Sequence, residues 1–174
     1  MSAKKTRPQV GLGLSRDYFS KNLIPAPPEL YELCYYSPSP LFHYDGVEFL
    51  YVLDGRGSFC VNGHFYPCVR GNLAVLSFYH LTRILPQQGA SVRILRCRMT
   101  LNTFLYFLAN PCCPHTSLGQ SEEPAYVKFE GTNLDYMESL FHELEKELSF
   151  NSPFHDNMSI FLLTELFARI DRLN

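Results

Sequence analysis

Residues 47–69 read VEFLYVLDGRGSFCVNGHFYPCV, and this stretch decides the fold class. Its first seven residues are rich in valine, leucine and aromatic side chains, which is typical of a β-strand. Asp54-Gly55 is predicted to turn the chain, and SFCV at 58–61 to form a second strand. Asn62-Gly63 is a preferred pair for a two-residue type I′ hairpin turn, and HFYPCV at 64–69 is a third strand. The stretch therefore predicts short antiparallel strands in succession.

More short strand-like segments lie on both sides of this stretch. They cover residues 30–36, 73–77, 81–85, 91–99 and 124–131. Turn-forming residues separate many of them at intervals of about eight to twelve residues, which is typical of a β-sandwich or barrel. The sequence therefore predicts a mainly β fold.

The hydrophobic period changes after Asn102. A short helix is predicted near 102–109, and Asn110-Pro111 ends it. A longer helix is predicted over 133–149, with apolar residues at the spacing of a helical seam. The seam residues are Leu134, Met137, Phe141, Leu144 and Leu148. A last helix, from about 154 to 173, is apolar over much of its circumference, so it must be covered on more than one side. The helix pair is expected to pack on the barrel and also on a second copy or on another domain.

These elements divide the chain into three predicted parts. Residues 1–22 contain few apolar positions and are expected to form a flexible arm. Residues 23–131 form the barrel, and residues 132–174 form a two-helix dimerisation segment.

Composition limits the classes of function. The net charge is −2, from 15 basic and 17 acidic residues, which is unlike a free-standing nucleic-acid-binding domain. No apolar run approaches the ~20 residues that a membrane helix needs. The basic start MSAKKTRPQV has no apolar stretch behind it and is not a signal peptide, so a cytoplasmic location and no membrane partner are expected.

The six cysteines are expected to be reduced. Cys60 should face Phe65 across the Asn62-Gly63 hairpin, which leaves Cys68 out of register for a disulfide with Cys60. Adjacent cysteines chelate one metal ion poorly, so the segment 112–115, Cys-Cys-Pro-His, is interpreted as a loop.

A family resemblance rests on the order of several of these segments. His43, Glu48 and Gly55 have the spacing of the first cupin motif, and strand-turn-strand segments follow them. More narrowly, EFLYVLDGRGSFCVNG, then RGNLAVLSFYH, then LLTELFARIDRL resemble the sensory half of AraC-type transcriptional regulators. The resemblance implies a cupin-like double-stranded β-helix (a jelly-roll barrel) followed by a C-terminal helical pair.

For function, the resemblance implies an effector-binding and dimerisation domain. The effector would be a small molecule, either a sugar or a small carboxylate or aromatic compound, and the chain would form a homodimer through its C-terminal helices. DNA would be bound only through a helix-turn-helix domain, for which this sequence holds no candidate.

A metal centre is the alternative interpretation. His43, Glu48 and His80 are a possible two-histidine, one-carboxylate set for a metal-dependent cupin enzyme such as an oxygenase or isomerase. His43 and Asp45 are a second possible start of such a set. However, Leu41 stands where a metal cupin has a histidine, and His80 departs from the expected spacing. We therefore expect no metal, no cofactor and no catalytic residue; motifs such as GxSxG and the P-loop are also missing.

In the preferred interpretation, Glu48 points into the barrel, and alternation turns Leu50 and Val52 inward with it. Glu48 then pairs with His43, waits for a ligand, or lies at the rim in water. On the strand 91–99, alternation places Arg96 and Arg98 on one face and Arg93 on the other. An inward arginine would favour an anionic ligand. The favoured placement is outside, against the acidic helix 133–149, because arginine is usually at the surface.

The predicted ligand-binding residues are His43, Glu48, His80, Tyr36 and Arg96. A third interpretation is a dimerisation module that binds no ligand, because its barrel is fully packed.

Overall fold

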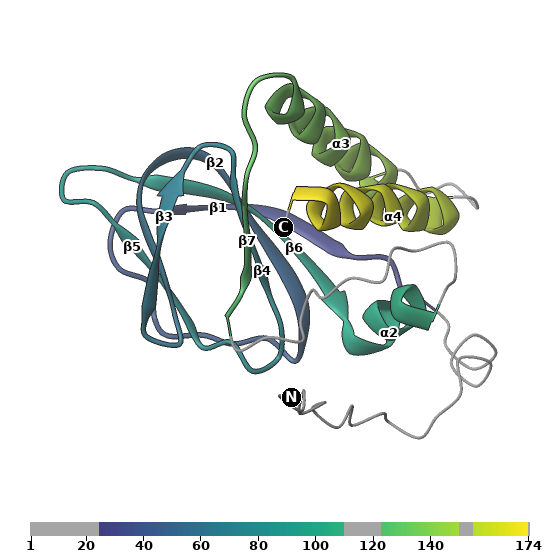
Figure 1. The fold of residues 1–174 in the computed structure, drawn as a ribbon, viewed down its shortest axis with the longest axis horizontal. Helices are drawn as coiled ribbons and strands as arrows, with labels where there is room; N and C mark the ends of the chain where they lie inside the picture. Colours follow the sequence, from purple (N-terminus) through teal and green to yellow (C-terminus); the bar gives the residue numbers. More distant parts are fainter. Residues whose placement is uncertain (1–24, 110–122, 150–154, 174) are drawn as a thin grey trace, which may run out of the picture.

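The computed structural model describes residues 25–109, 123–149 and 155–173 (Figure 1). The predicted arm 1–22 and the segment 112–115 lie outside these residues. In the described part, seven strands precede and follow a short helix, and a helical pair ends the chain. The strands are β1 Glu29–Tyr35, β2 Gly46–Val61, β3 His64–Val69, β4 Asn72–Leu76, β5 Thr82–Pro86, β6 Val92–Thr100 and β7 Ala125–Lys128. The helices are α2 Leu101–Ala109, α3 Thr132–Ser149 and α4 His155–Leu173.

The strands form two layers that share β2. Its first half lies in a sheet with the order β1-β6-β2-β4-β7, and its second half pairs with β3 and β5. Every pairing is antiparallel. The predicted mainly β fold with a C-terminal helical pair is therefore confirmed.

The predicted turn at Asp54-Gly55 is wrong. β2 continues through this point as one strand, and the register against β6 shifts between Val52 and Asp54. Gly55 has a φ of 104°, and a Cβ there would lie 2.0 Å from the Ser91 carbonyl oxygen. Glycine therefore lets the strand bulge and bend from one layer into the other while it keeps its partner β6.

The predicted hairpin at Asn62-Gly63 is confirmed. Both residues have positive φ, 48° and 86°, as a type I′ turn requires. Cys60 lies opposite Phe65, and Cys68 lies opposite Gly57, so the two cysteines do not meet. Cys34, Cys60, Cys68 and Cys97 are free thiols, and burial raises the pKa of Cys68 and Cys97 to about 12.

The two faces of the larger sheet belong to two different cores. Glu48, Leu50 and Val52 point inward, and Leu50 and Val52 pack with Phe59 and Ile84 of the smaller layer, as alternation predicted. Val47, Phe49 and Tyr51 point outward and pack beneath the helices. In Figure 1 the pair α3 and α4 stands beside this outer face, with α2 near the end of β6.

The predicted seam of α3 is used within the chain. Met137, Phe141 and Leu144 are almost fully buried in the outer core, and the Phe141 ring lies 5.0 Å from the Tyr51 ring, centroid to centroid. Leu134 and Leu148 are partly buried against the same core. The structure thus corrects the expectation that Met137, Phe141 and Leu144 face a second copy, because they are buried within one chain. For Leu134 and Leu148, which are only partly buried, that expectation stays a prediction.

Among the described helices, none is long and apolar enough to cross a bilayer.

Candidate functional site

Glu48 is the centre of a buried ion cluster inside the barrel. It lies in the middle of β2 and is 2% exposed. Arg96 donates to it twice, from Nε to Oε2 at 2.7 Å and from Nη2 to Oε1 at 3.0 Å. Arg98 donates from Nε to Oε2 at 3.2 Å. Both arginines come from β6, where Arg98 is the direct cross-strand partner of Glu48 and Arg96 is its diagonal neighbour.

The cluster holds one more positive charge than negative charge. Burial alone would lower the pKa of Arg96, but the hydrogen bonds and the charge of Glu48 outweigh it, and the pKa is raised. The bidentate geometry satisfies both carboxylate oxygens, which is what a buried carboxylate requires. Arg98 is the more accessible of the two arginines, since 24% of its side chain is exposed against 7% for Arg96.

Aromatic rings surround the two guanidinium groups. Arg96 lies over the Phe42 ring at 4.3 Å, and Arg98 lies 4.8 Å from the Tyr44 ring and 5.6 Å from the Tyr31 ring, each measured to the centroid. Burial raises the pKa of the Tyr31 and Tyr44 phenols, so both are neutral near pH 7. These rings can hold an aromatic or apolar group beside a cation.

His43 does not reach Glu48. Its side chain is 59% exposed in the segment before β2, and its Nε2 lies 3.3 Å from Oδ1 of Asp45. Of the three alternatives for Glu48, pairing with His43 is wrong, because the arginines of β6 occupy both carboxylate oxygens. A position at the rim in water is also wrong, because Glu48 is buried.

His80 is buried, but it belongs to the turn after β4. Its Nδ1 accepts a hydrogen bond from the Ser77 backbone N–H at 2.9 Å and lies 3.2 Å from the Ser77 hydroxyl. Within the described ranges, no group of three histidine, cysteine, aspartate or glutamate residues could hold a metal ion. The set of His43, Glu48 and His80 is therefore not assembled.

Two further predictions about single residues are corrected. Tyr36 is 80% exposed, because it follows the last residue of β1, and it lines no barrel site. The favoured placement of Arg96 outside, against the acidic helix 133–149, is also wrong, since Arg96 is buried against Glu48.

The site residues that the sequence missed are Phe42, Tyr44 and Tyr31, together with the role of Arg98 as a second partner of Glu48. Tyr31 is predictable if β1 is assumed to pair with β6, because it then lies directly opposite Arg96. Phe42 and Tyr44 lie in the irregular segment before β2, where alternation gives no orientation.

Comparisons with known proteins show similarity of fold. No family model matches this chain, and no curated protein matches it in sequence. Among solved structures, ToxT from Vibrio cholerae O395, a regulator of the AraC family, matches 83% of this chain with a TM-score of 0.51 and 9% identity. A cupin protein from Bacteroides fragilis matches 43% of this chain and 67% of its own, with a TM-score of 0.41 and 14% identity.

The chain spans about half of ToxT, 54% of its length. At this low identity the likeness is one of fold alone. The mainly β fold with a C-terminal helical pair is therefore shared with the matched part of an AraC-family regulator.

Proposed function

We propose that this chain is the effector-sensing and dimerisation domain of a cytoplasmic AraC-type transcriptional regulator. The similarity to ToxT supports this, because it covers a larger share of the chain than the barrel region alone. DNA binding would belong to a separate helix-turn-helix domain. We propose that binding of the effector to this chain changes how that domain binds DNA.

The effector is a small carboxylate, and aromatic carboxylates fit best. The observation that carries this step is the Glu48 cluster, in which two guanidinium groups share one carboxylate. Arg98 uses only its Nε toward Glu48 and is partly exposed, so its remaining N–H groups can bind an anion. Tyr31 and Tyr44 flank it with their ring faces.

Thermal-shift and calorimetric titration with a panel of benzoate, short aliphatic carboxylates and neutral sugars tests this proposal. A ligand stabilises the folded protein by mass action, so benzoate should raise the melting temperature and the sugars should not. Arg98→Met should remove the response. Arg93→Met is the matched control, because Arg93 lies on the opposite face of β6 and pairs with Glu32 at 3.4 Å.

Two outcomes would overturn the carboxylate effector. One is an equal response of both arginine variants, and the other is no response of the wild type to any carboxylate. A response to a neutral sugar that both variants retain would move the effector class to sugars.

The dimer contact must use residues other than the buried seam of α3. On α4, Phe161 is 67% exposed and Met158 is 44% exposed, one helical turn apart. We assign the homodimer contact to this face of α4. Sedimentation at about 100 μM, well above the micromolar affinity of a stable pair, should show a dimer, and a monomer there would overturn the assignment.

A further inference from the structure

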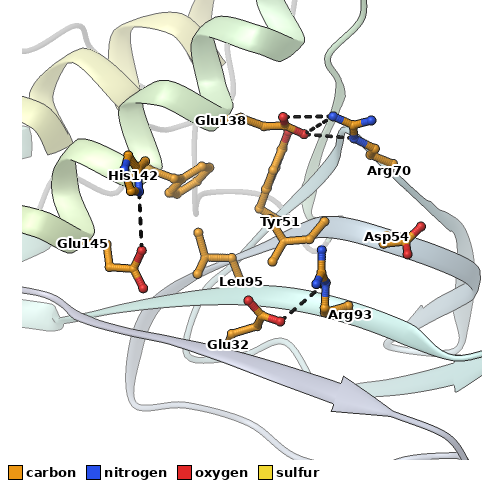
Figure 2. Close-up of a pocket in the computed structure, with 11 residues that line it drawn as sticks. Glu32, Tyr51, Asp54, Arg70, Arg93, Leu95, Glu138, His142 and Glu145 are labelled. Atoms are coloured by element: carbon orange, nitrogen blue, oxygen red, sulfur yellow. Dashed lines mark hydrogen bonds and ion pairs between the residues drawn. The ribbon is translucent and has the colours of Figure 1, made fainter.

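A groove lies between the outer face of the larger sheet and α3, on the other side of the sheet from the Glu48 cluster (Figure 2). Its volume is about 520 Å³, within the usual range of small-molecule sites. Side chains of β1, β2 and β6 form one wall and side chains of α3 form the other. The charged members are Glu32, Asp54, Arg70, Arg93, Glu138 and Glu145.

The Tyr51 hydroxyl is the first sign that the groove takes a ligand. Tyr51 is fully buried and lines the groove, and its hydroxyl makes no hydrogen bond to any residue that the structure describes. Figure 2 shows its side chain extending toward the pair of Arg70 and Glu138. A buried hydroxyl without a partner is unfavourable, so a group that satisfies it is favoured at this place.

The charge of the groove is the second sign. Four carboxylates and two guanidinium groups line it, which leaves two net negative charges when His142 is counted as neutral. Glu138 is paired with Arg70 at 2.9 Å, and Glu32 with Arg93 at 3.4 Å. Asp54 lies opposite Arg93 across the strands but has no ion pair within the described part of the chain. An unpaired carboxylate at one place in the groove and a hydroxyl without a described partner at another favour a ligand that is positively charged and can donate hydrogen bonds at both places.

The groove also has an apolar part. Leu53, Leu95 and Phe141 contribute hydrocarbon surface to its lining. A ligand with a charge at each end and methylene groups between would bury its chain here while both ends stay paired.

We propose that this groove binds a small aliphatic diamine. One ammonium group pairs with Asp54, the methylene chain packs on Leu95 and Phe141, and the second ammonium donates to the Tyr51 hydroxyl oxygen beside Glu138. The pair of Arg70 and Glu138 moves aside to admit it. Both side chains are partly exposed, 56% and 31%, and an exposed ion pair contributes little to stability.

This second site is distinct from the proposed carboxylate site inside the barrel. Its ligand would touch both the sheet and α3, so binding would stabilise the position of the helical pair against the barrel. Because the two sites lie on opposite faces of the sheet, a failure of one proposal leaves the other standing.

Calorimetric titration with putrescine at low ionic strength tests the groove, with the monoamine and the uncharged diol of the same chain length as controls. We expect saturable binding of putrescine, with the monoamine weaker and the diol silent. Asp54→Asn should weaken putrescine by about tenfold or more, and Tyr51→Phe by about three- to tenfold, because each removes one polar contact. Both variants keep the size of the side chain, and circular dichroism checks their fold.

Asp45→Asn is the matched control for charge. Asp45 is 92% exposed and lies before β2, so its loss should leave the affinity unchanged. Absence of saturable binding up to about 10 mM, which corresponds to a binding free energy near −3 kcal/mol, would overturn the proposal. It would equally be overturned if Asp45→Asn weakened putrescine as much as Asp54→Asn, or if Tyr51→Phe bound it like the wild type.

Discussion

Two carboxylate–guanidinium clusters lie on opposite sides of the same sheet, and burial separates their roles. Inside the barrel, Glu48 is 2% exposed and is held by Arg96 and Arg98. Outside, Glu138 on α3 is held by Arg70 with the same bidentate geometry, but 31% of the Glu138 side chain and 56% of the Arg70 side chain are exposed. The chemistry of the two clusters is alike, whereas the access of water to them is not.

This difference predicts unequal contributions to stability. A buried charge depends on its partner, since breaking a buried pair leaves a charge in a medium of low polarity. An exposed pair exchanges its partner for water at little cost. The inner cluster should therefore be a fixed structural element in which only Arg98 is accessible to a ligand. The outer pair of Arg70 and Glu138 should be able to move at the rim of the groove.

The largest effect is expected from Glu48→Gln. Its loss of charge leaves Arg96 buried without a carboxylate, and this should lower the free energy of unfolding by about 3–5 kcal/mol. Urea denaturation monitored by circular dichroism measures it. The double variant Glu48→Met, Arg96→Met should be much closer to the wild type, because it removes both buried charges together. A loss below about 1 kcal/mol in the single variant would mean that the inner cluster is not the dry, fixed element described above.

Much of the fold could be predicted because its signals are local. The hairpin at Asn62-Gly63, the strands and the helix boundaries follow from turn residues and from hydrophobic period. The continuity of β2 could not be predicted, since Asp54-Gly55 has the composition of a turn. The pairing of β2 with β6, distant in sequence, holds the strand extended through that point.

The candidate site was only partly predictable for the same reason. The cupin motif implied that Glu48 points into the barrel, and alternation placed Arg96 and Arg98 on one face of their strand without deciding that this face is the inner one. The contact between Glu48 and Arg96 depends on the register between two strands far apart in sequence. His43 and Tyr36 lie just outside their strands, where alternation no longer fixes the direction of a side chain. The sequence offers no signal that assigns Tyr51 to a site, because an outward aromatic residue in a strand is usually part of a hydrophobic core. Only the structure shows that its hydroxyl has no described partner.

Ionisation of the Tyr51 phenol should make the free energy of unfolding depend on pH, with an effect of intermediate size that is specific to the outer face of the sheet. Burial first, and then the charge of Glu138, raises the pKa of its phenol above the ordinary range. The folded state therefore holds this proton more tightly than the unfolded state, in which tyrosine ionises near pH 10. The stabilisation is fully present below about pH 10 and is lost as the pH rises toward the folded pKa, at about 1.4 kcal/mol per pH unit.

Urea denaturation of the wild type and of Tyr51→Phe at several alkaline pH values measures this slope. The variant lacks the phenol, so its stability should fall less steeply above pH 10. Parallel curves would show that Tyr51 ionises as easily in the folded protein as in the unfolded chain, and that the outer face is open to water at this point.

The smallest effect is expected from Glu138→Gln, the outer counterpart of Glu48→Gln. Removal of an exposed partner should lower the free energy of unfolding by only about 0.2–1 kcal/mol. This loss should shrink further in about 1 M salt, where the screening length falls to roughly 3 Å, whereas the loss in Glu48→Gln should barely respond to salt. Urea denaturation of both variants at low and high salt measures the contrast. If Glu138→Gln cost as much as Glu48→Gln, the rim would be as fixed as the inner cluster, and a ligand in the groove could not displace it.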